Sequence, residues 1–246
     1  MRVVDERAED GSVDSEPPVP DLIEVGVPVG GRVVVFGDSH LTVPATASSE
    51  QVAGELARAV VAATGPAVVV VAGDLFELVA RPGIDVESVL RAHPRLRNAL
   101  SSFAKETDHR LIVLPGTHDA ALAWDHRARR TIEHDLGGQV ALAADLVVST
   151  GAGERRVRVE PGHQLDPNHA FSDPRDPGET PLGHHVTAHL SPLANRGDAD
   201  WLAGADRIVE AGDVVDFVRS RLLYRRLAPR LALLLLPFAV ALAAWA

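Results

Sequence analysis

Three short runs of consecutive apolar, mostly β-branched residues constrain the fold of this chain most strongly. They are Arg32–Phe36 (RVVVF), Ala67–Ala72 (AVVVVA) and His109–Leu114, which ends in LIVL. None of them alternates between apolar and polar residues, so each predicts a strand that is buried on both faces. Helical segments are expected between them, and this order is typical of a parallel sheet covered on both faces. The sequence therefore predicts an α/β fold.

The segments around these strands carry helix and turn signals. Apolar spacing predicts a helix from Ser48 or Ser49 to Ala63, ended by Gly65-Pro66, and the turn Gly151-Ala152-Gly153 predicts a β-hairpin. Further helices are expected over 86–105, interrupted near Pro94, and over 119–135, and the hairpin strands over 140–150 and 155–160.

Composition limits what a functional site in this chain can contain. There is no cysteine, so metal ligands would have to come from His, Asp, Glu, Asn and water. The net charge of −10 opposes nonspecific nucleic-acid binding, which needs a basic surface. At 246 residues, one large α/β domain is expected rather than two small ones.

The two ends of the chain differ from its middle. Residues 1–29 lack periodicity and are rich in acidic residues, so we expect a disordered leader without a signal peptide. Residues 231–246 are apolar and follow several arginines, which favours a membrane segment over 227–246 with the core domain at the cytoplasmic face. A helix buried in the protein's own core is the alternative. Because the apolar run reaches the last residue, we expect a longer membrane protein whose front part is this sequence.

Residues that commonly bind metal ions follow each predicted strand. A glycine directly precedes Asp38, Asp74 and His163, where it permits a sharp turn. Because the chemistry of parallel sheets gathers at the carboxyl ends of the strands, we expect these groups to converge. Each motif alone also fits a helix cap, a turn or a hydrogen-bonded histidine at a strand end. The groups are Asp38 and His40 after the first strand, Asp74 after the second, Thr117, His118 and Asp119 after the third, and His163 after the hairpin.

The types of these residues indicate the metals they would hold. Beyond a strand end the chain turns, so Asp38 and His40, two residues apart, can grip one ion. Asp74 could bridge two ions through its two oxygens. Such a mixture of oxygen and nitrogen ligands suits Mn, Fe or Zn, and we expect a site for two divalent metal ions.

The order Asp-x-His, Gly-Asp, Gly-Thr-His-Asp, Gly-His resembles the calcineurin-like metallophosphoesterases over residues 31–168, more than half the chain. The resemblance implies a layered α-β-β-α sandwich that hydrolyses a phosphodiester or pyrophosphate bond with a dinuclear metal site. Carried over by position, Asp38, His40 and Asp74 would hold the first metal, and Asp74 and His163 the second. His118 would protonate the leaving oxygen, with Asp119 orienting its ring.

The layout after His163 is similar to the branch of lipid-precursor pyrophosphohydrolases that act on UDP-diacylglucosamine. That similarity implies a phosphorylated small-molecule or lipid-linked substrate at the membrane surface. It divides the chain into the core at 30–170, a loop and helical cap at 171–226, and the membrane segment. Asp166 and Asn168 are expected either to contact substrate or to form an Asx turn, with His169 a weaker candidate.

The chain departs from the family pattern in two places. Thr117 stands where the family has an Asn whose oxygen binds the second metal, so Thr117 is expected to be a weak ligand. No closing Gly-His-x-His follows His163, and we expect the nearest candidates, His184 and His185, to be surface residues. The fold is therefore expected to be incomplete. These departures favour an alternative function, a degenerate non-catalytic domain that serves as a membrane-anchored scaffold.

Overall fold

The computed structural model describes residues 17–80, 83–185 and 187–188, and the short helical pieces 215–216, 219–220, 228–233 and 235–236. The chain divides into two compact units, Met1–Ala188 and His189–Ala246. The sheets, the helices that cover them and all the predicted site residues belong to the first unit. Of the second unit, only the helical pieces are described.

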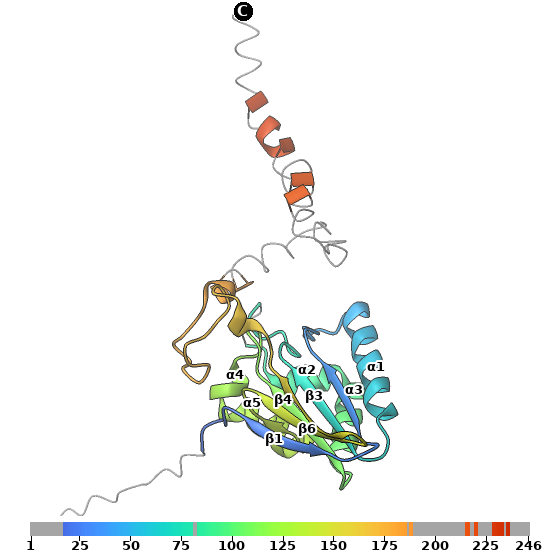
Figure 1. Ribbon diagram of the computed structural model, residues 1–246. Coiled ribbons are helices and arrows are strands. Elements are labelled where there is room, and N and C mark those ends of the chain that lie inside the picture. Colours follow the sequence, from blue (N-terminus) through green and yellow to red (C-terminus); the bar gives the residue numbers. More distant parts are fainter. Residues whose placement is uncertain are drawn as a thin grey trace, which may run out of the picture. The chain divides into compact units, whose positions relative to one another are not determined.

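The three apolar runs form the parallel sheet that they predict (Figure 1). β2 (Arg32–Phe36), β3 (Ala67–Ala72), β4 (His109–Leu114) and β5 (Gln139–Val140) lie in that order, and every neighbouring pair is parallel. Since the side chains of a strand alternate between its faces, Val69 and Val71 enter one core, while Val68 and Val70 enter another. The prediction of buried parallel strands is therefore confirmed for the middle of the sheet.

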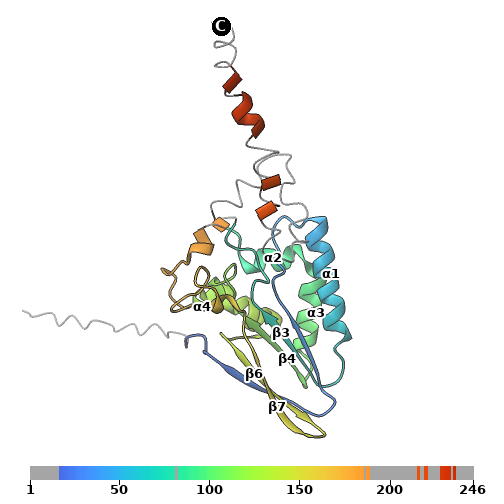
Figure 2. The ribbon, with the colours of Figure 1, turned by 45° about the horizontal axis from the view of Figure 1, so that its top comes forward.

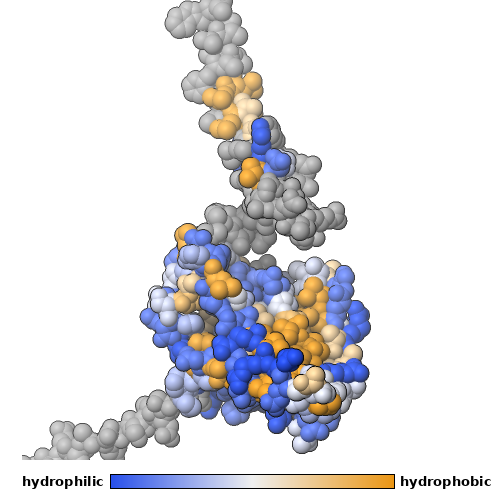
Figure 3. All heavy atoms as spheres, in the orientation of Figure 1, coloured by the Kyte–Doolittle hydropathy of each residue, from blue (hydrophilic) through white to orange (hydrophobic). Residues whose placement is uncertain are grey.

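β2 differs from this expectation because it lies at the edge of the sheet. Val33 and Val35 pair in register with Val68 and Val70, yet they are 37% and 47% exposed. Figure 3 shows apolar residues gathered over this part of the surface, surrounded by hydrophilic ones. A continuous apolar run thus also occurs in an edge strand, only one face of which is covered.

Helices cover one face of the parallel sheet (Figures 1 and 2). The first of them, α1, begins after Thr46, whose hydroxyl accepts a hydrogen bond from the backbone of Ser49. Pro94 separates α2 from α3, as predicted, because proline suits the first turn of a helix and not its interior. The helices are α1 (Ala47–Ala62), α2 (Val86–Ala92), α3 (Pro94–Ala104), α4 (Ala121–Trp124), α5 (His126–Arg130) and the π-helix Thr131–Leu136.

A second, mixed sheet packs on the other face of the parallel sheet (Figure 2). It contains β1 (Ile23–Val27), β6 (Ala144–Thr150) and β7 (Gly153–Val159) in the order β1-β6-β7. β6 and β7 form the predicted hairpin, and β1 pairs with β6 in parallel. The α/β class is therefore confirmed. Among the described residues we find three layers, helices, sheet and sheet, and no outer helical layer of the kind that a four-layer sandwich would have.

β1 corrects the prediction that residues 1–29 form a disordered leader. Ile23, Val25 and Val27 alternate with Glu24 and Gly26, which is the period of a strand with one buried face. Pairing with β6, far away in the sequence, buries Val25 and Val27 in the core between the sheets. The prediction was wrong from residue 17 onward, because five residues carry too short a pattern without their distant partner. Residues 1–16 lie outside the described part.

The predicted membrane helix at 227–246 is wrong for the residues that the structure describes. Residues 228–233 and 235–236 of that segment are described as helical. None of the helices in the described part of the chain is long and apolar enough to cross a membrane. The prediction relied on hydropathy, although the apolar run at 231–246 is shorter than the roughly 20 residues that a bilayer requires. Most of the predicted cap at 171–226 falls outside the described residues, apart from 171–185, 187–188 and two short helical pieces.

Candidate metal centre

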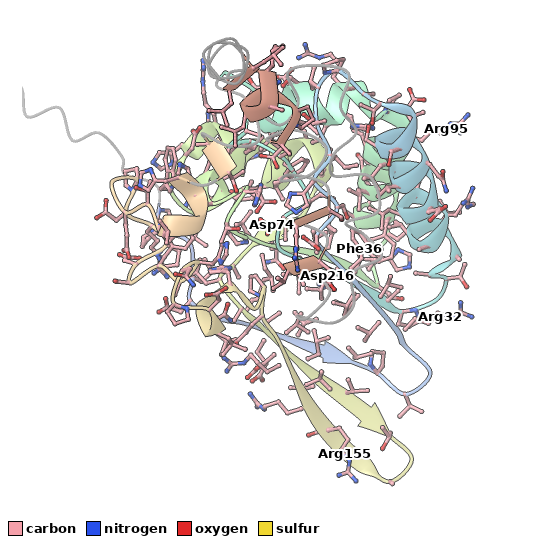
Figure 4. The ribbon with its side chains drawn as sticks, turned by 90° about the horizontal axis from the view of Figure 1, so that it is seen from above. Arg32, Phe36, Asp74, Arg95, Arg155 and Asp216 are labelled. Atoms are coloured by element: carbon pink, nitrogen blue, oxygen red, sulfur yellow. The ribbon has the colours of Figure 1, made fainter. Side chains whose placement is uncertain are left out.

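The loops that follow β2, β3 and β4 meet at the carboxyl edge of the parallel sheet, as predicted. The backbone N–H of Asp38 donates to the carbonyl of Gly73 over 3.0 Å, and that of His40 to the carbonyl of Asp74, also over 3.0 Å. The loop after β4 joins them where the N–H of Leu78 donates to the carbonyl of His118 over 3.2 Å. Figure 4 views this edge from above, with Asp74 and Phe36, the last residue of β2, labelled.

The side chains of Asp38, His40 and Asp74 come together at this edge. One ligand atom from each lies within 4.8 Å of the others, and Nε2 of His40 lies 2.8 Å from Oδ1 of Asp38. These three residues are also the non-glycine residues of the described chain that adopt positive φ, at 54°, 46° and 52°. This conformation is uncommon outside glycine, and such strain tends to occur at functional sites.

The backbone around Asp74 leaves no room for larger residues. A Cβ at Gly116 would overlap the Asp74 carboxylate, and one at Gly73, where φ is +84°, would lie 2.8 Å from Cβ of Pro161. Glycine at these two positions therefore lets three loops approach one carboxylate.

The loop after β4 holds both oxygens of Asp74. The N–H of His118 donates to Oδ1 over 2.7 Å, and the hydroxyl of Thr117 lies 3.4 Å from Oδ2 as a long hydrogen bond. Thr117 is buried, so its side chain has little freedom to turn elsewhere. The prediction that Thr117 is a weak metal ligand stays a prediction.

Glu77 is a site residue that the sequence motifs did not predict. Its Oε2 lies 2.6 Å from Nδ1 of His118 and 3.4 Å from Nδ1 of His40. The two imidazole rings meet edge to face with their centroids 4.3 Å apart. His40, Glu77 and His118 thus form a second group whose ligand atoms lie within 4.8 Å of one another. The available signal was an acidic residue three positions after Asp74, directly behind the buried Leu75 and Phe76.

These contacts change the acidity of the residues involved. Although burial opposes it, hydrogen bonds from His118 and His40 hold the pKa of Glu77 well below its usual range. The hydrogen bond to Glu77 is the main cause that raises the pKa of His40 to about 9, with Asp38 and Asp74 adding to it. Without a bound cation, His40 is therefore protonated at neutral pH and supplies the positive charge between these carboxylates.

The structure corrects the predicted role of Asp119. Its carboxylate does not orient the His118 ring but accepts four backbone N–H groups, those of Gly116 (2.6 Å), Asp74 (3.3 Å), Leu75 (2.8 Å) and Phe76 (3.2 Å). The residue is fully buried. Burial and the nearby Asp74 charge raise the pKa of Asp119 to about 6, against these hydrogen bonds. The hydrogen bonds of Asp119 hold the loops after β3 and β4 together. The side chain that contacts the His118 ring is Glu77.

His163 lies beside the centre without joining either group of ligand atoms. It begins a 3-10 turn after β7, and Pro161 brings this segment against Gly73. Its Nδ1 is buried and has no hydrogen-bond partner among the described residues. Burial lowers the pKa of His163, whereas the charge of Asp74 acts to raise it. A buried ring nitrogen without a partner, within electrostatic reach of Asp74, fits a metal ligand.

Asp166 and Asn168 form the Asx turn that was one of their two predicted roles. Oδ1 of Asp166 accepts the N–H of Asn168 over 2.9 Å, and Oδ2 lies 2.9 Å from Nδ1 of His169. The hydrogen bonds that the turn supplies, first the Asn168 N–H and then His169, lower the pKa of Asp166. His184 and His185 lie in a helical turn at 182–185, where their rings contact each other, and neither belongs to the two groups of ligand atoms.

The carboxyl edge of the sheet therefore carries His, Asp and Glu groups that could hold a metal ion. Their oxygen and nitrogen donors suit divalent transition metals, and His40 links the two groups. No family model, curated protein or solved structure matches the chain.

Proposed function

We propose that this protein is a metal-dependent hydrolase that cleaves a phosphodiester or pyrophosphate bond in a phosphorylated small molecule. One observation carries the proposal: the three residues held at positive φ are the three whose ligand atoms meet, Asp38, His40 and Asp74. A fold that needed only capping residues there would have no reason to keep this strain. The resemblance to the calcineurin-like metallophosphoesterases supports the same function.

The proposed metal ligands come from four segments of the chain. Asp38, His40 and Asp74 would hold one divalent ion, and Asp74 and His163, with Thr117 as a weak ligand, a second. When bound, such a pair of ions neutralises phosphoryl oxygens and makes a nucleophilic water more acidic. Asp38 and Asp74 would provide the negative charge that retains the ions, and Gly73 and Gly116 provide the space for the loops to approach.

His118 is proposed as the acid that protonates the leaving oxygen. Its Nδ1 lies 2.6 Å from Glu77, so Nε2 is the ring nitrogen that can give a proton to the substrate. The Glu77 carboxylate, which lies beside Nδ1, fixes the orientation of the ring. Because Glu77 remains ionised over the physiological pH range, it does not compete for that proton.

Hydrolysis of bis(p-nitrophenyl) phosphate in the presence of Mn²⁺ tests the proposal. We expect the wild type to release p-nitrophenolate and Asp74→Ala to release it at the buffer rate, because that substitution removes a ligand of both ions. Asp135→Ala, at an exposed site in the π-helix, is the matched control and is expected to retain full activity. Turnover by Asp74→Ala close to that of the wild type would rule out this site.

A non-catalytic domain that binds a single cation is the second candidate. One observation favours it: Thr117 stands where the resemblance implies an Asn ligand, and its hydroxyl lies 3.4 Å from Oδ2 of Asp74. Under this alternative, calorimetry would detect one Mn²⁺ per chain, with Asp38 and Asp74 required for it, while no phosphoester would be hydrolysed.

A further inference from the structure

A cavity of about 790 Å³ opens directly beside the candidate metal centre. Its walls come from Leu78, Val79 and residues 84–87, from α4 and α5 with the residues that flank them, and from a group of later residues, Phe171, Pro177, Glu179, Thr180, His184 and Ala188. Cavities that hold small ligands in proteins commonly enclose about 300–1,000 Å³. This cavity is therefore large enough for a substantial organic group.

The cavity and the metal centre share residues and hydrogen bonds. Thr117 lines the cavity, and its hydroxyl lies 3.4 Å from Oδ2 of Asp74. Leu78 and Val79 line it as well, and the N–H of Val79 donates to Oε1 of Glu77 over 3.1 Å. A phosphoryl group held by metal ions bound at Asp74 would have its substituent within reach of this cavity.

Two aromatic side chains distinguish the lining. Trp124 is 43% exposed and lies in the lining, so its ring is open to a ligand in the cavity. Phe171 also lines the cavity. Its ring packs edge to face on the His163 ring, with the centroids 5.5 Å apart. Phe171 thus joins the cavity to the proposed ligand His163.

Charged residues at the cavity complete its chemistry. Arg127 and Arg130 from α5 line it together with Glu87 and Glu179, so cations and carboxylates both border the apolar surfaces. Planar aromatic rings pack favourably on Trp and Phe, and ring nitrogens and carbonyl groups at their edges can pair with charged groups. A saturated chain would use only the apolar part of this lining.

We propose that the cavity binds a planar aromatic group carried by the phosphoester substrate. This inference rests on the proposed function, because metal ions bound by Asp38, His40 and Asp74 would have to hold the phosphoryl group for its substituent to enter the cavity. Trp124 and Phe171 then contact the ring, and Arg127 contacts its polar edge. These residues select the substrate, while the reacting phosphoryl group lies at the neighbouring centre.

Three phosphonates that the enzyme cannot hydrolyse at their carbon–phosphorus bond test the inference by calorimetry. Phenylphosphonate carries a planar ring, cyclohexylphosphonate a saturated ring of similar size, and methylphosphonate neither. For the Mn²⁺-loaded wild type we expect phenylphosphonate to bind about tenfold more tightly than the other two. In Trp124→Leu, which keeps apolar area but removes the ring system, this preference is expected to fall to about twofold or less.

Matched measurements separate the possible outcomes. Val61→Ala, at an exposed site on α1, is expected to keep the wild-type preference, and methylphosphonate is expected to bind all three proteins equally. Methylphosphonate binding that requires Mn²⁺, without a preference for phenylphosphonate over cyclohexylphosphonate, would overturn the aromatic assignment and leave the proposed function intact. Failure of all three phosphonates to bind in a Mn²⁺-dependent manner would overturn both.

Discussion

Glu77 and His118 form the closest contact between side chains of the candidate centre, with 2.6 Å between Oε2 and Nδ1. The same oxygen lies 3.4 Å from Nδ1 of His40. A single carboxylate thus connects a proposed metal ligand to the proposed acid. This arrangement predicts that substitutions at Glu77 affect proton transfer more than metal retention.

Glu77→Gln is expected to lower turnover of bis(p-nitrophenyl) phosphate about 100-fold, because the His118 ring loses the carboxylate that fixes its orientation. Steady-state kinetics with Mn²⁺ measures this change. Calorimetry of Mn²⁺ binding is expected to give an affinity within about threefold of the wild type, and Glu50→Gln, exposed in the first turn of α1, serves as the control. Loss of Mn²⁺ binding in Glu77→Gln would show instead that Glu77 is a ligand.

Thr117→Asn is expected to strengthen binding of a second metal ion. An amide oxygen reaches further than the Thr117 hydroxyl and coordinates metals without having to direct a proton at Asp74. Elemental analysis after Mn²⁺ loading and gel filtration is expected to give about one ion for the wild type and about two for the variant. Two tightly held ions in the wild type would contradict the weak second site.

Asp119→Asn is expected to destabilise the fold by about 3 kcal/mol, since a buried amide cannot replace this carboxylate. Each carboxylate oxygen accepts two backbone N–H groups, whereas the NH₂ group of asparagine would face two of these donors. Urea unfolding followed by circular dichroism measures the change, with Asp135→Asn as the exposed control. A midpoint within experimental error of the wild type would refute the fastening role of Asp119.

Binding of Mn²⁺ is expected to raise the melting temperature, because the ion binds the folded arrangement of Asp38, His40 and Asp74 and not the unfolded chain. At a concentration 100-fold above the dissociation constant, the expected stabilisation is about 2.7 kcal/mol. Differential scanning calorimetry with and without EDTA measures it. Asp38→Asn is expected to reduce the shift, and an unchanged shift in that variant would exclude Asp38 from the ligands.

Asp145 lies outside the metal centre, and its lowered pKa predicts that the stability of the fold depends on pH. Hydrogen bonds from Arg158 and then Arg156 lower the pKa of this carboxyl on β6. A carboxyl with a lower pKa in the folded state stabilises the fold above its unfolded pKa of about 3.9, and this contribution is lost as the pH falls through the folded value. The wild type is therefore expected to exceed Asp145→Asn in urea midpoint between pH 5 and pH 7. The difference should shrink below about pH 4, and a constant difference down to pH 2 would contradict the ion pairing.

The parallel sheet could be predicted closely because its information is local. One continuous apolar run makes up most of each of the strands β2, β3 and β4. The turns that follow them are marked by Gly37, Gly73 and Gly116. The convergence of Asp38, His40 and Asp74 followed from that sheet, since the carboxyl ends of parallel strands share one edge.

The features that could not be predicted depend on contacts between distant segments. β1 became a strand through β6, and the partial exposure of β2 depends on how far the second sheet extends. Glu77 is a member of the centre because His118 folds back onto it from the loop after β4. Asp119 was misassigned because its neighbour in sequence, His118, is not its partner in space.

The hydrogen bonds by which Asp119 holds the two loops together affect which substitutions the centre can accept. All four hydrogen bonds that Asp119 accepts come from main-chain N–H groups. They therefore do not depend on which side chains the loops carry. Substitutions at neighbouring positions such as Thr117 can therefore alter metal preference or substrate selection while the loop geometry persists. The main-chain geometry of the two loops thus depends on the carboxylate of one buried residue, and a change of side chain at Thr117 leaves those hydrogen bonds in place.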